Sequence, residues 1–220
     1  MRRHRGAHAF EIPVLVDPPS AEALYMSKRI AIIQGHPDAR GNHLGHALAQ
    51  AYAQGAEQAG NEIRFIDVAA LQFSLLHTKE EWETGALPEA IREAQRTISW
   101  ADHLVLFYPL WLGSMPALLK GFLEQVFRPQ FAIAKPEGGK MGKKLLKGKS
   151  ARIVVTMGMP AFVYRWYFGA HSLKSLERNI LGFSGVGPIK ASLFGLIEAS
   201  SSATRERWLA KMRALGSKAR

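Results

Sequence analysis

The chain of 220 residues contains no cysteine. Disulfide bonds, thiol nucleophiles and cysteine-ligated metal sites are therefore excluded. The eight histidines do not have the spacing of a paired-histidine motif such as HExxH, so we expect no metal site. A long apolar run is also missing. The segment between Asp102 and Lys120 has no formal charge, but two prolines and a glycine interrupt it, which argues against a membrane span.

Acidic residues are few: the chain has 18 Asp and Glu but 29 Lys and Arg, which gives a formal net charge of +11. The basic residues concentrate in residues 140–152 and 205–220. Neither segment has the interleaved aromatics of a base-stacking surface, and no helix-turn-helix, RNA-recognition or zinc-finger signature accompanies them. A basic surface that attracts small anions is favoured over specific nucleic-acid binding. Non-specific binding of anionic polymers remains an alternative.

Residues 1–27 differ from the rest of the chain. They begin basic but lack the apolar core and the cleavage site of a secretory signal. Met26 would make a natural start just before the first apolar run. We therefore expect residues 1–27 to be a disordered extension or the result of a misassigned start, and residues 28–220 to form a single cytoplasmic domain.

The stretch 102–127 organises the chain. Residues 104–108 form an apolar run that suits a strand buried on both faces. Pro109 cannot donate to a ladder and Gly113 permits unusual backbone angles, so a loop that can lie against a ligand follows the strand. Pro116 then opens a helix with apolar residues at helical spacing. The sequence predicts strand, ligand loop and helix.

Apolar runs predict four more strands, at 30–33, 63–68, 150–158 and 188–194. Helical spacing predicts helices that include 44–55, 88–100, 116–127 and 204–215, and a short exposed helix around Trp82. Five β/α alternations imply an α/β fold with a parallel sheet and helices on both faces. In the strand order 2-1-3-4-5, the loops 35–42, 109–115 and 157–166 converge at the switch point between the first and third strands.

Two of these loops leave alternatives open. In the first, Asn42 or Gly41 can cap the next helix, whose positive end suits a phosphate. His36 or His43 alone more often stabilises a loop than binds a ligand. In the third, the aromatic residues of 162–168 either pack on a neighbouring element or form a ligand platform.

Three segments carry a family resemblance: RIAIIQGHPDARGNH (29–43), YPLWLGSMPALLKGFLEQVF (108–127) and TMGMPAFVYRWYFGAH (156–171). In this order they resemble the flavodoxin-fold NAD(P)H:quinone oxidoreductases of the DT-diaphorase type and their bacterial relatives. The resemblance covers residues 28–216. It implies a flavodoxin-like three-layer sandwich with a five-stranded parallel sheet in the order 2-1-3-4-5.

The resemblance also implies a flavin site. His36 and Asn42 match positions beside the flavin phosphate and ribityl chain, and Tyr164 and His171 match catalytic positions beside the substrate. The isoalloxazine ring would meet residues of the second and third loops, namely Pro109, Leu110, Trp111, Leu112, Gly113, Thr156, Gly158 and Met159.

Three departures from the mammalian enzymes stand out. The first loop is one residue shorter, Trp111 comes one position earlier, and four residues rather than three separate Tyr164 from Gly169. The last departure bears on the position of His171.

The implied activity is a two-electron transfer from NAD(P)H through FAD to quinones or similar acceptors, with ping-pong kinetics and FMN as the alternative cofactor. The family implies a homodimer, with residues 162–168 contributing to the interface. Some bacterial relatives resemble regulatory subunits of potassium-efflux antiporters, so a membrane transporter partner is an alternative.

Overall fold

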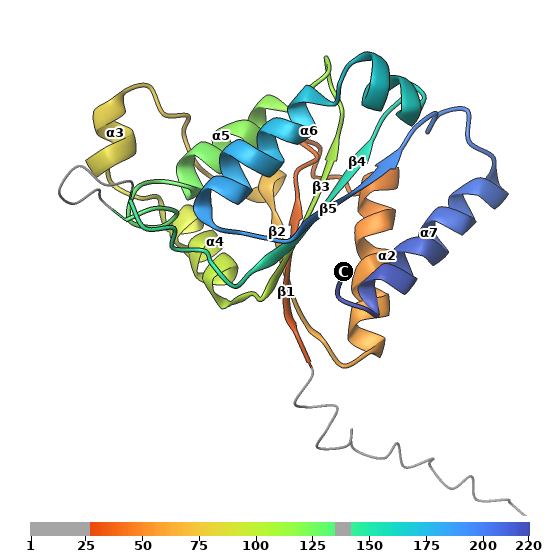
Figure 1. The fold of residues 1–220 in the computed structure, drawn as a ribbon, viewed down its shortest axis with the longest axis horizontal. Helices are drawn as coiled ribbons and strands as arrows, with labels where there is room; N and C mark the ends of the chain where they lie inside the picture. The colour runs from red at the N-terminus through yellow and green to blue at the C-terminus, as the bar shows by residue number, and fades with distance from the viewer. Residues whose placement is uncertain (1–26, 135–141) are drawn as a thin grey trace, which may run out of the picture.

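The computed structural model of the protein describes residues 27–134 and 142–220. Almost all of the expected N-terminal extension and part of the lysine-rich segment lie outside these residues. Within them, five strands form one parallel sheet in the order β2-β1-β3-β4-β5, with helices on both faces (Figure 1). The predicted fold and strand order are confirmed.

The strands match the apolar runs of the sequence. They are β1 (Arg29–Gln34), β2 (Glu62–Asp67), β3 (His103–Pro109), β4 (Ser150–Thr156) and β5 (Ile189–Phe194). All seven residues of the central strand β3 are buried, which explains its unbroken apolar run. The edge strands β2 and β5 keep exposed residues.

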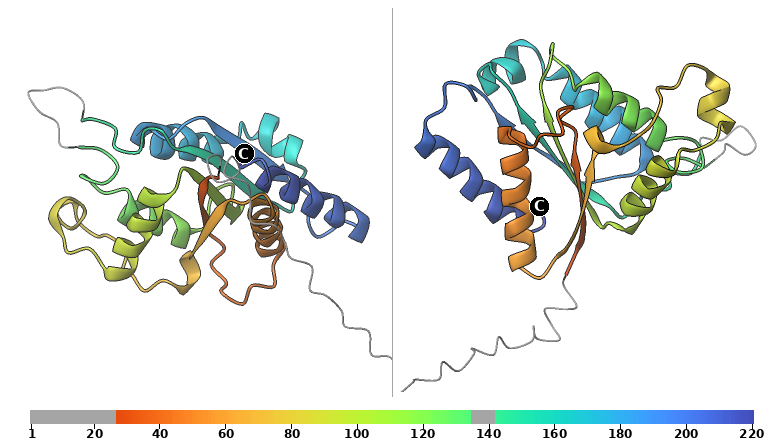
Figure 2. Two further views of the ribbon diagram at one scale, coloured as in Figure 1. Left: turned by 90° about the horizontal axis from the view of Figure 1, so that it is seen from below. Right: turned by 180° about the vertical axis from the view of Figure 1, so that it is seen from behind.

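Each face of the sheet has its own layer of helices (Figures 1 and 2). One layer is α2 (Leu44–Gln58) and α7 (Ser202–Gly216). The other is α4 (Glu89–Trp100), α5 (Ala117–Val126), α6 (His171–Ser175) and η3 (Leu176–Gly182). The remaining short elements are η1 (Val68–Ala70), α3 (Lys79–Thr84) and η2 (Val163–Tyr167).

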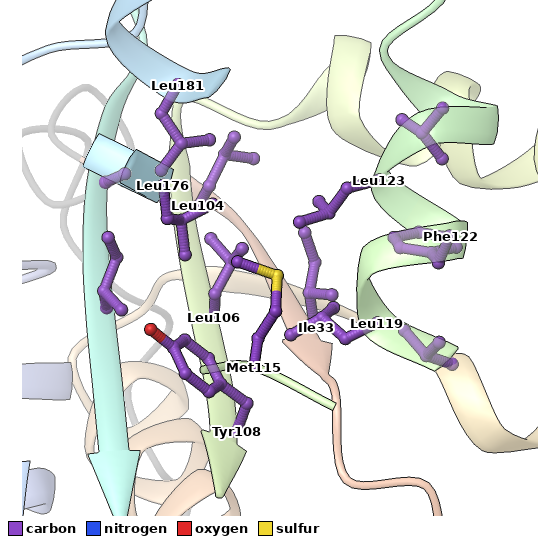
Figure 3. Close-up of a cluster of buried hydrophobic side chains, with 14 of the residues drawn as sticks. Ile33, Leu104, Leu106, Tyr108, Met115, Leu119, Phe122, Leu123, Leu176 and Leu181 are labelled. Atoms are coloured by element: carbon purple, nitrogen blue, oxygen red, sulfur yellow. The ribbon is translucent and has the colours of Figure 1, made fainter. Parts of the chain in front are cut away.

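Alternate residues of β3 serve the two layers. Leu104, Leu106 and Tyr108 belong to the cluster that faces α5 and η3 (Figure 3), whereas Val105 and Phe107 belong to the cluster that faces α2 and α7. Full burial of a large apolar side chain is worth about 1.5–3 kcal/mol. The sheet is therefore held by two cores that share one central strand.

The helix α2 corrects one prediction. Its N-cap is His43, without a side-chain hydrogen bond, so the expectation that Asn42 or Gly41 caps it is wrong. The physical reason lies in the loop, where Gly41 has φ +75° and the ring of His43 is held by Asp38, with 2.9 Å between Nε2 and Oδ2. These contacts place the start of the helix one residue further along.

Among the residues that the structure describes, no helix combines the length and apolar character needed to cross a bilayer. The uncharged run after Asp102 is instead divided between β3, a turn and α5.

The helices α2 and α7 pack side by side through two glycines (Figure 2). A Cβ atom at Gly55 would lie 2.0 Å from the carbonyl oxygen of Arg213, and one at Gly216 would lie 2.0 Å from that of Tyr52. Backbone atoms cannot move aside as a flexible side chain can. Both positions therefore require glycine for this close approach.

We predict that Gly55→Ala lowers the free energy of unfolding by about 1–3 kcal/mol, because the added methyl group separates α2 from α7. Gly45→Ala on the same helix is the control, since a Cβ there meets no atom within 4 Å. It should leave stability unchanged or raise it by up to about 1 kcal/mol. Urea denaturation measures both, and equal effects of the two variants would contradict the packing.

Candidate functional site

The loops after β1, β3, β4 and β5 meet at the carboxyl edge of the sheet. The Gly35 N–H donates to Phe107 O at 2.7 Å, and the Leu110 N–H donates to Thr156 O at 2.8 Å. The Leu196 N–H, after β5, donates to Met159 O at 3.2 Å. The predicted convergence of the three loops is confirmed.

Residues 111–114 form a tight turn at this edge. Trp111 and Ser114 exchange two backbone hydrogen bonds of 2.8 and 2.9 Å, and the two central residues, Leu112 and Gly113, have φ +47° and +76°. Positive φ at both central positions is the pattern of a type I′ turn. Leu112 is fully exposed, and a Cβ at Gly113 would meet no atom within 4 Å. The tip of the turn is therefore open to a ligand.

Two contacts hold the turn from opposite sides. The rings of Trp111 and His36 meet edge to face, with centroids 5.9 Å apart. On the other side, the hydroxyl oxygens of Ser114 and Ser172 lie 3.3 Å apart. The turn therefore bridges the first loop and α6.

The first loop contains three close imidazoles. The ring of His36 stacks on that of His43, with centroids 3.9 Å apart, and the ring of His46 lies 5.4 Å from His36. The Asp38 carboxylate binds both His43 and Arg40, at 2.9 and 2.6 Å. The Asp38 N–H donates to Nδ1 of His36 at 3.1 Å, so His36 keeps its Nε2 for another partner.

These surroundings fix the charges of the loop. Burial, and then the neighbouring His43 and His46, lower the pKa of His36 to about 4. Burial likewise lowers the pKa of His46. Hydrogen bonds from Arg40 and His43 hold the pKa of the Asp38 carboxyl well below its usual range. At neutral pH, His36 and His46 are neutral and Asp38 is charged.

Two side chains beside this loop keep buried polar atoms without partners in the described part of the chain. They are the amide nitrogen of Gln34 and both ring nitrogens of His46. The Gln34 amide oxygen accepts the His36 N–H at 3.1 Å, which places Gln34 against the first loop. A buried polar group without a partner costs about 1–3 kcal/mol, so these atoms mark room for a ligand or water.

The sequence did not single out Gln34 or His46. A usable signal exists for each: Gln34 is the one polar residue that ends the apolar run of β1, and His46 follows His43 by about one helical turn.

The other predicted contacts of the ring and phosphate lie around the same edge. Asn42 and Gly158 are exposed, Leu110 and Met159 are partly buried, and Thr156 and Pro109 are buried at the ends of their strands. The Glu198 carboxylate approaches Gly158, since a Cβ there would lie 3.0 Å from Oε2. The loops thus bring all the sequence-predicted cofactor residues to one edge.

Within residues 27–134 and 142–220, no three His, Asp or Glu side chains converge in a way that could hold a metal ion.

Comparison with known proteins decides the family. A family model described as a flavodoxin-like fold (Flavodoxin_2) matches residues 28–215. The chain belongs to this flavodoxin-like family.

Two similar proteins have names that state an oxidoreductase or dehydrogenase activity. An uncharacterized NAD(P)H oxidoreductase from Haemophilus influenzae is 30% identical over 179 residues, which cover 80% of this chain and 87% of that protein. The ribosyldihydronicotinamide dehydrogenase (quinone) of Mus musculus is 31% identical over 143 residues, 61% of this chain and 59% of that protein.

Solved structures have the same fold. Smu.1420 from Streptococcus mutans matches with a TM-score of 0.70 and 26% identity, and covers 86% of this chain and 98% of its own. The NAD(P)H:quinone oxidoreductase from Methanothermobacter marburgensis has a TM-score of 0.70 and 24% identity, and covers 87% of this chain and 96% of its own. The second likeness is one of fold alone.

The two residues that the sequence resemblance predicts to be catalytic, Tyr164 and His171, differ in their exposure to solvent. Tyr164 is 1% exposed, and its hydroxyl accepts the Leu173 N–H at 3.2 Å. His171 is exposed at the start of α6, and its ring folds back over Gly169, where a Cβ would lie 2.9 Å from Nε2. No hydrogen bond between the Tyr164 and His171 side chains is found in the described residues.

The segment before Gly169 forms the wide turn η2, which has π-helical geometry. Here the Phe168 N–H donates to Val163 O at 3.1 Å, five residues back. In this turn the side chain of Tyr164 is buried in the core, whereas those of Trp166 and Tyr167 are exposed.

A second buried phenol lies beside Tyr164. Tyr108, at the end of β3 (Figure 3), is 2% exposed, and its hydroxyl lacks a partner with hydrogen-bonding geometry in the described chain. Burial raises the pKa of both phenols, and the nearby Ser172 hydroxyl partly offsets the rise. The Tyr164 hydroxyl therefore has a hydrogen-bond partner, whereas the Tyr108 hydroxyl has none in the described chain.

This contrast predicts opposite results for two matched substitutions. Tyr164→Phe removes the acceptor of the Leu173 N–H and should lower the free energy of unfolding by about 0.5–1.5 kcal/mol. Tyr108→Phe removes an unpaired hydroxyl and should leave the free energy unchanged or raise it. Urea denaturation of both variants at one pH is the measurement, and a larger loss in Tyr108→Phe would show that its hydroxyl is paired in solution.

Proposed function

We propose that the protein is a flavin-dependent NAD(P)H oxidoreductase that transfers two electrons to quinones or similar acceptors. The observation that carries the proposal is the open turn 111–114, held between His36 and Ser172 beside the partnerless polar atoms of Gln34 and His46. A relative that aligns with 80% of the chain and is named an NAD(P)H oxidoreductase supports it. Cytoplasmic location is part of the proposal.

The residues at this edge fit a flavin. The free Nε2 of His36, the buried amide of Gln34 and the start of α2 suit its phosphate. The open tip at Leu112 and Gly113 suits the ring, because no side chain covers it. These contacts do not distinguish FAD from FMN. A relative supports FMN: an FMN-dependent NADH:quinone oxidoreductase from Hahella chejuensis is 36% identical over 110 residues, half of this chain.

A bound flavin would accept a hydride from NAD(P)H and deliver it to the acceptor. The protein contributes a fixed backbone at Gly113, whose N–H group can donate to an oxygen on which negative charge develops. His36 and Ser172 keep this turn in position. Because one open edge serves both partners, NAD(P)⁺ leaves before the acceptor binds, and the kinetics are ping-pong.

Proton supply to the acceptor is the second task of the site. His171 is exposed at the edge, and an imidazole is a common general acid and base in enzymes. Tyr164 acts behind it, because its hydroxyl holds the N–H of Leu173 two residues further along α6. In this proposal His171 gives its proton to the acceptor oxygen and Tyr164 fixes the helix that carries His171.

The first prediction of the proposal concerns the visible absorption spectrum of the protein. The purified protein, or the protein after addition of FAD or FMN, should show the visible absorption of a bound flavin, and anaerobic NADH or NADPH should bleach it. Release by heat and chromatography identifies the flavin. With a quinone as acceptor, double-reciprocal plots should be parallel.

A protein that binds neither flavin would contradict the proposed function. Converging lines with a bound flavin would contradict only the ping-pong order.

We further propose a homodimer that uses the aromatic residues of η2 and its flanks. Phe162, Trp166, Tyr167 and Phe168 are between 49% and 82% exposed. Contiguous apolar surface of this kind marks interaction sites, and aromatic residues are enriched at the centres of protein interfaces.

Light scattering should therefore give twice the 24.3 kDa of one chain. Trp166→Glu should shift the mass toward the monomer, because it places a charge in the contact. Trp82→Glu on α3, another exposed aromatic, is the control and should keep the dimer. A monomeric wild type, or a dimer that survives Trp166→Glu, would argue against this interface.

A further inference from the structure

The imidazoles of His36, His43 and His46, here called the histidine cluster, lie within 3.9–5.8 Å of one another by ring centroid. Three histidines that each approach the other two are costly to charge together, because like charges at this range repel strongly. An anion bound beside the cluster would offset this repulsion and make protonation of the imidazoles less costly.

The fixed charges around the cluster do not supply that anion. Asp38 is the one carboxylate in contact, and it is already bound by Arg40 and His43. Asp67, at the end of β2, acts on His46 only from a distance. Trp111, which closes the side of His36, is uncharged. The described groups leave His36 and His46 without a carboxylate of their own.

The cluster also borders unfilled space and unused donors. Gly45 in the first turn of α2 is buried, yet a Cβ there would meet no atom within 4 Å. The amide nitrogen of Gln34, which is 4% exposed, and both ring nitrogens of His46 have no partner in the described chain. A purely structural cluster would satisfy these atoms within the protein.

We propose that the histidine cluster and Gln34 form an anion receptor that takes up a proton from solvent as it binds the phosphate of the flavin. The inference rests on the proposed function and adds His43, His46 and Gln34 to the site, together with a pH dependence. No electron moves in this step: one imidazole nitrogen gains a proton, and water or buffer loses it.

The physical basis is linkage between two equilibria. In the free protein, burial keeps His36 and His46 neutral at pH 7. A phosphate dianion against the rings stabilises an imidazolium, so its pKa rises on binding. The complex then holds more protons than the free protein, and affinity falls as pH rises. The loss approaches about tenfold per pH unit where one full proton is taken up.

Calorimetric titration of the flavin-free protein with FMN and FAD tests the inference directly. Titrations in buffers of different ionisation enthalpy give the number of protons taken up per flavin. A pH range of about 7.5 to 8.5 keeps the FMN phosphate almost wholly dianionic, because its own pKa is about 6, so that the uptake reports on the protein. Riboflavin, which lacks the phosphate, is the ligand control.

Two variants localise the proton. His46→Gln keeps a polar side chain but cannot be protonated, so proton uptake should fall and the pH dependence of affinity should flatten. His77→Gln, an exposed histidine outside the cluster, is the matched control and should behave as wild type. Riboflavin should bind without proton uptake to all three proteins.

Each outcome decides a different claim. Uptake by wild type and His77→Gln that is reduced in His46→Gln supports the inference. Flavin binding without uptake by wild type, or equal uptake in His46→Gln, overturns it and leaves the proposed function intact. If no flavin binds, the proposed function fails. NMR titration of the histidine rings with sulfate, whose charge is constant in this range, then decides the receptor alone, and pKa values that sulfate does not raise overturn it.

Discussion

Burial of β3 on both faces is the constraint on which the rest of the structure depends. A strand with all seven residues buried requires a helical layer on each side of the sheet. Its alternating side chains supply Leu104 and Leu106 to one core and Val105 and Phe107 to the other. The two layers cover the faces of the sheet and leave its carboxyl edge to the loops. The candidate site lies at that edge, which is where ligands bind in open parallel sheets.

The turn 111–114 shows how the end of β3 is converted into a binding surface. Pro109 closes the strand, and Leu112 and Gly113 then adopt positive φ. For Leu112 this conformation costs on the order of 1–3 kcal/mol and persists only where neighbouring contacts hold it. Here the ring of His36 and the hydroxyl of Ser172 hold the turn. One contact comes from the first loop and the other from α6, so the shape of the turn depends on neighbouring elements of the same edge.

The sequence was sufficient for the parts of the fold that depend on burial. Uniform apolar runs located the strands, and helical spacing located α2, α4, α5 and α7, because both patterns follow directly from what each element packs against. The loops of the site were also predicted, since the carboxyl edge of a parallel sheet follows from strand order alone. Family resemblance, rather than periodicity, named the individual residues within those loops.

What the sequence did not reveal depends on contacts between distant residues. His43 rather than Asn42 caps α2 because its ring is held by Asp38 and stacks on His36. The inward direction of Tyr164 depends on the wide turn η2, which no local pattern predicts. The position of Gln34 at the end of an apolar run and the helical spacing of His46 from His43 are visible in the sequence, but the buried atoms that lack partners are visible only once the neighbouring residues are in place.

The pairing of Asp38 with Arg40 connects the net charge of the chain to its site. A protein with a formal charge of +11 attracts anions over its whole surface, but such attraction is weak and screened by salt. At the first loop the nearest carboxylate, that of Asp38, already binds Arg40 and His43, and His36 and His46 have no carboxylate of their own. An anion that arrives there meets desolvated donors that no internal acceptor has taken. In the proposed function, the phosphate of the flavin would use these donors at one edge of the sheet, in addition to the general attraction of the basic surface.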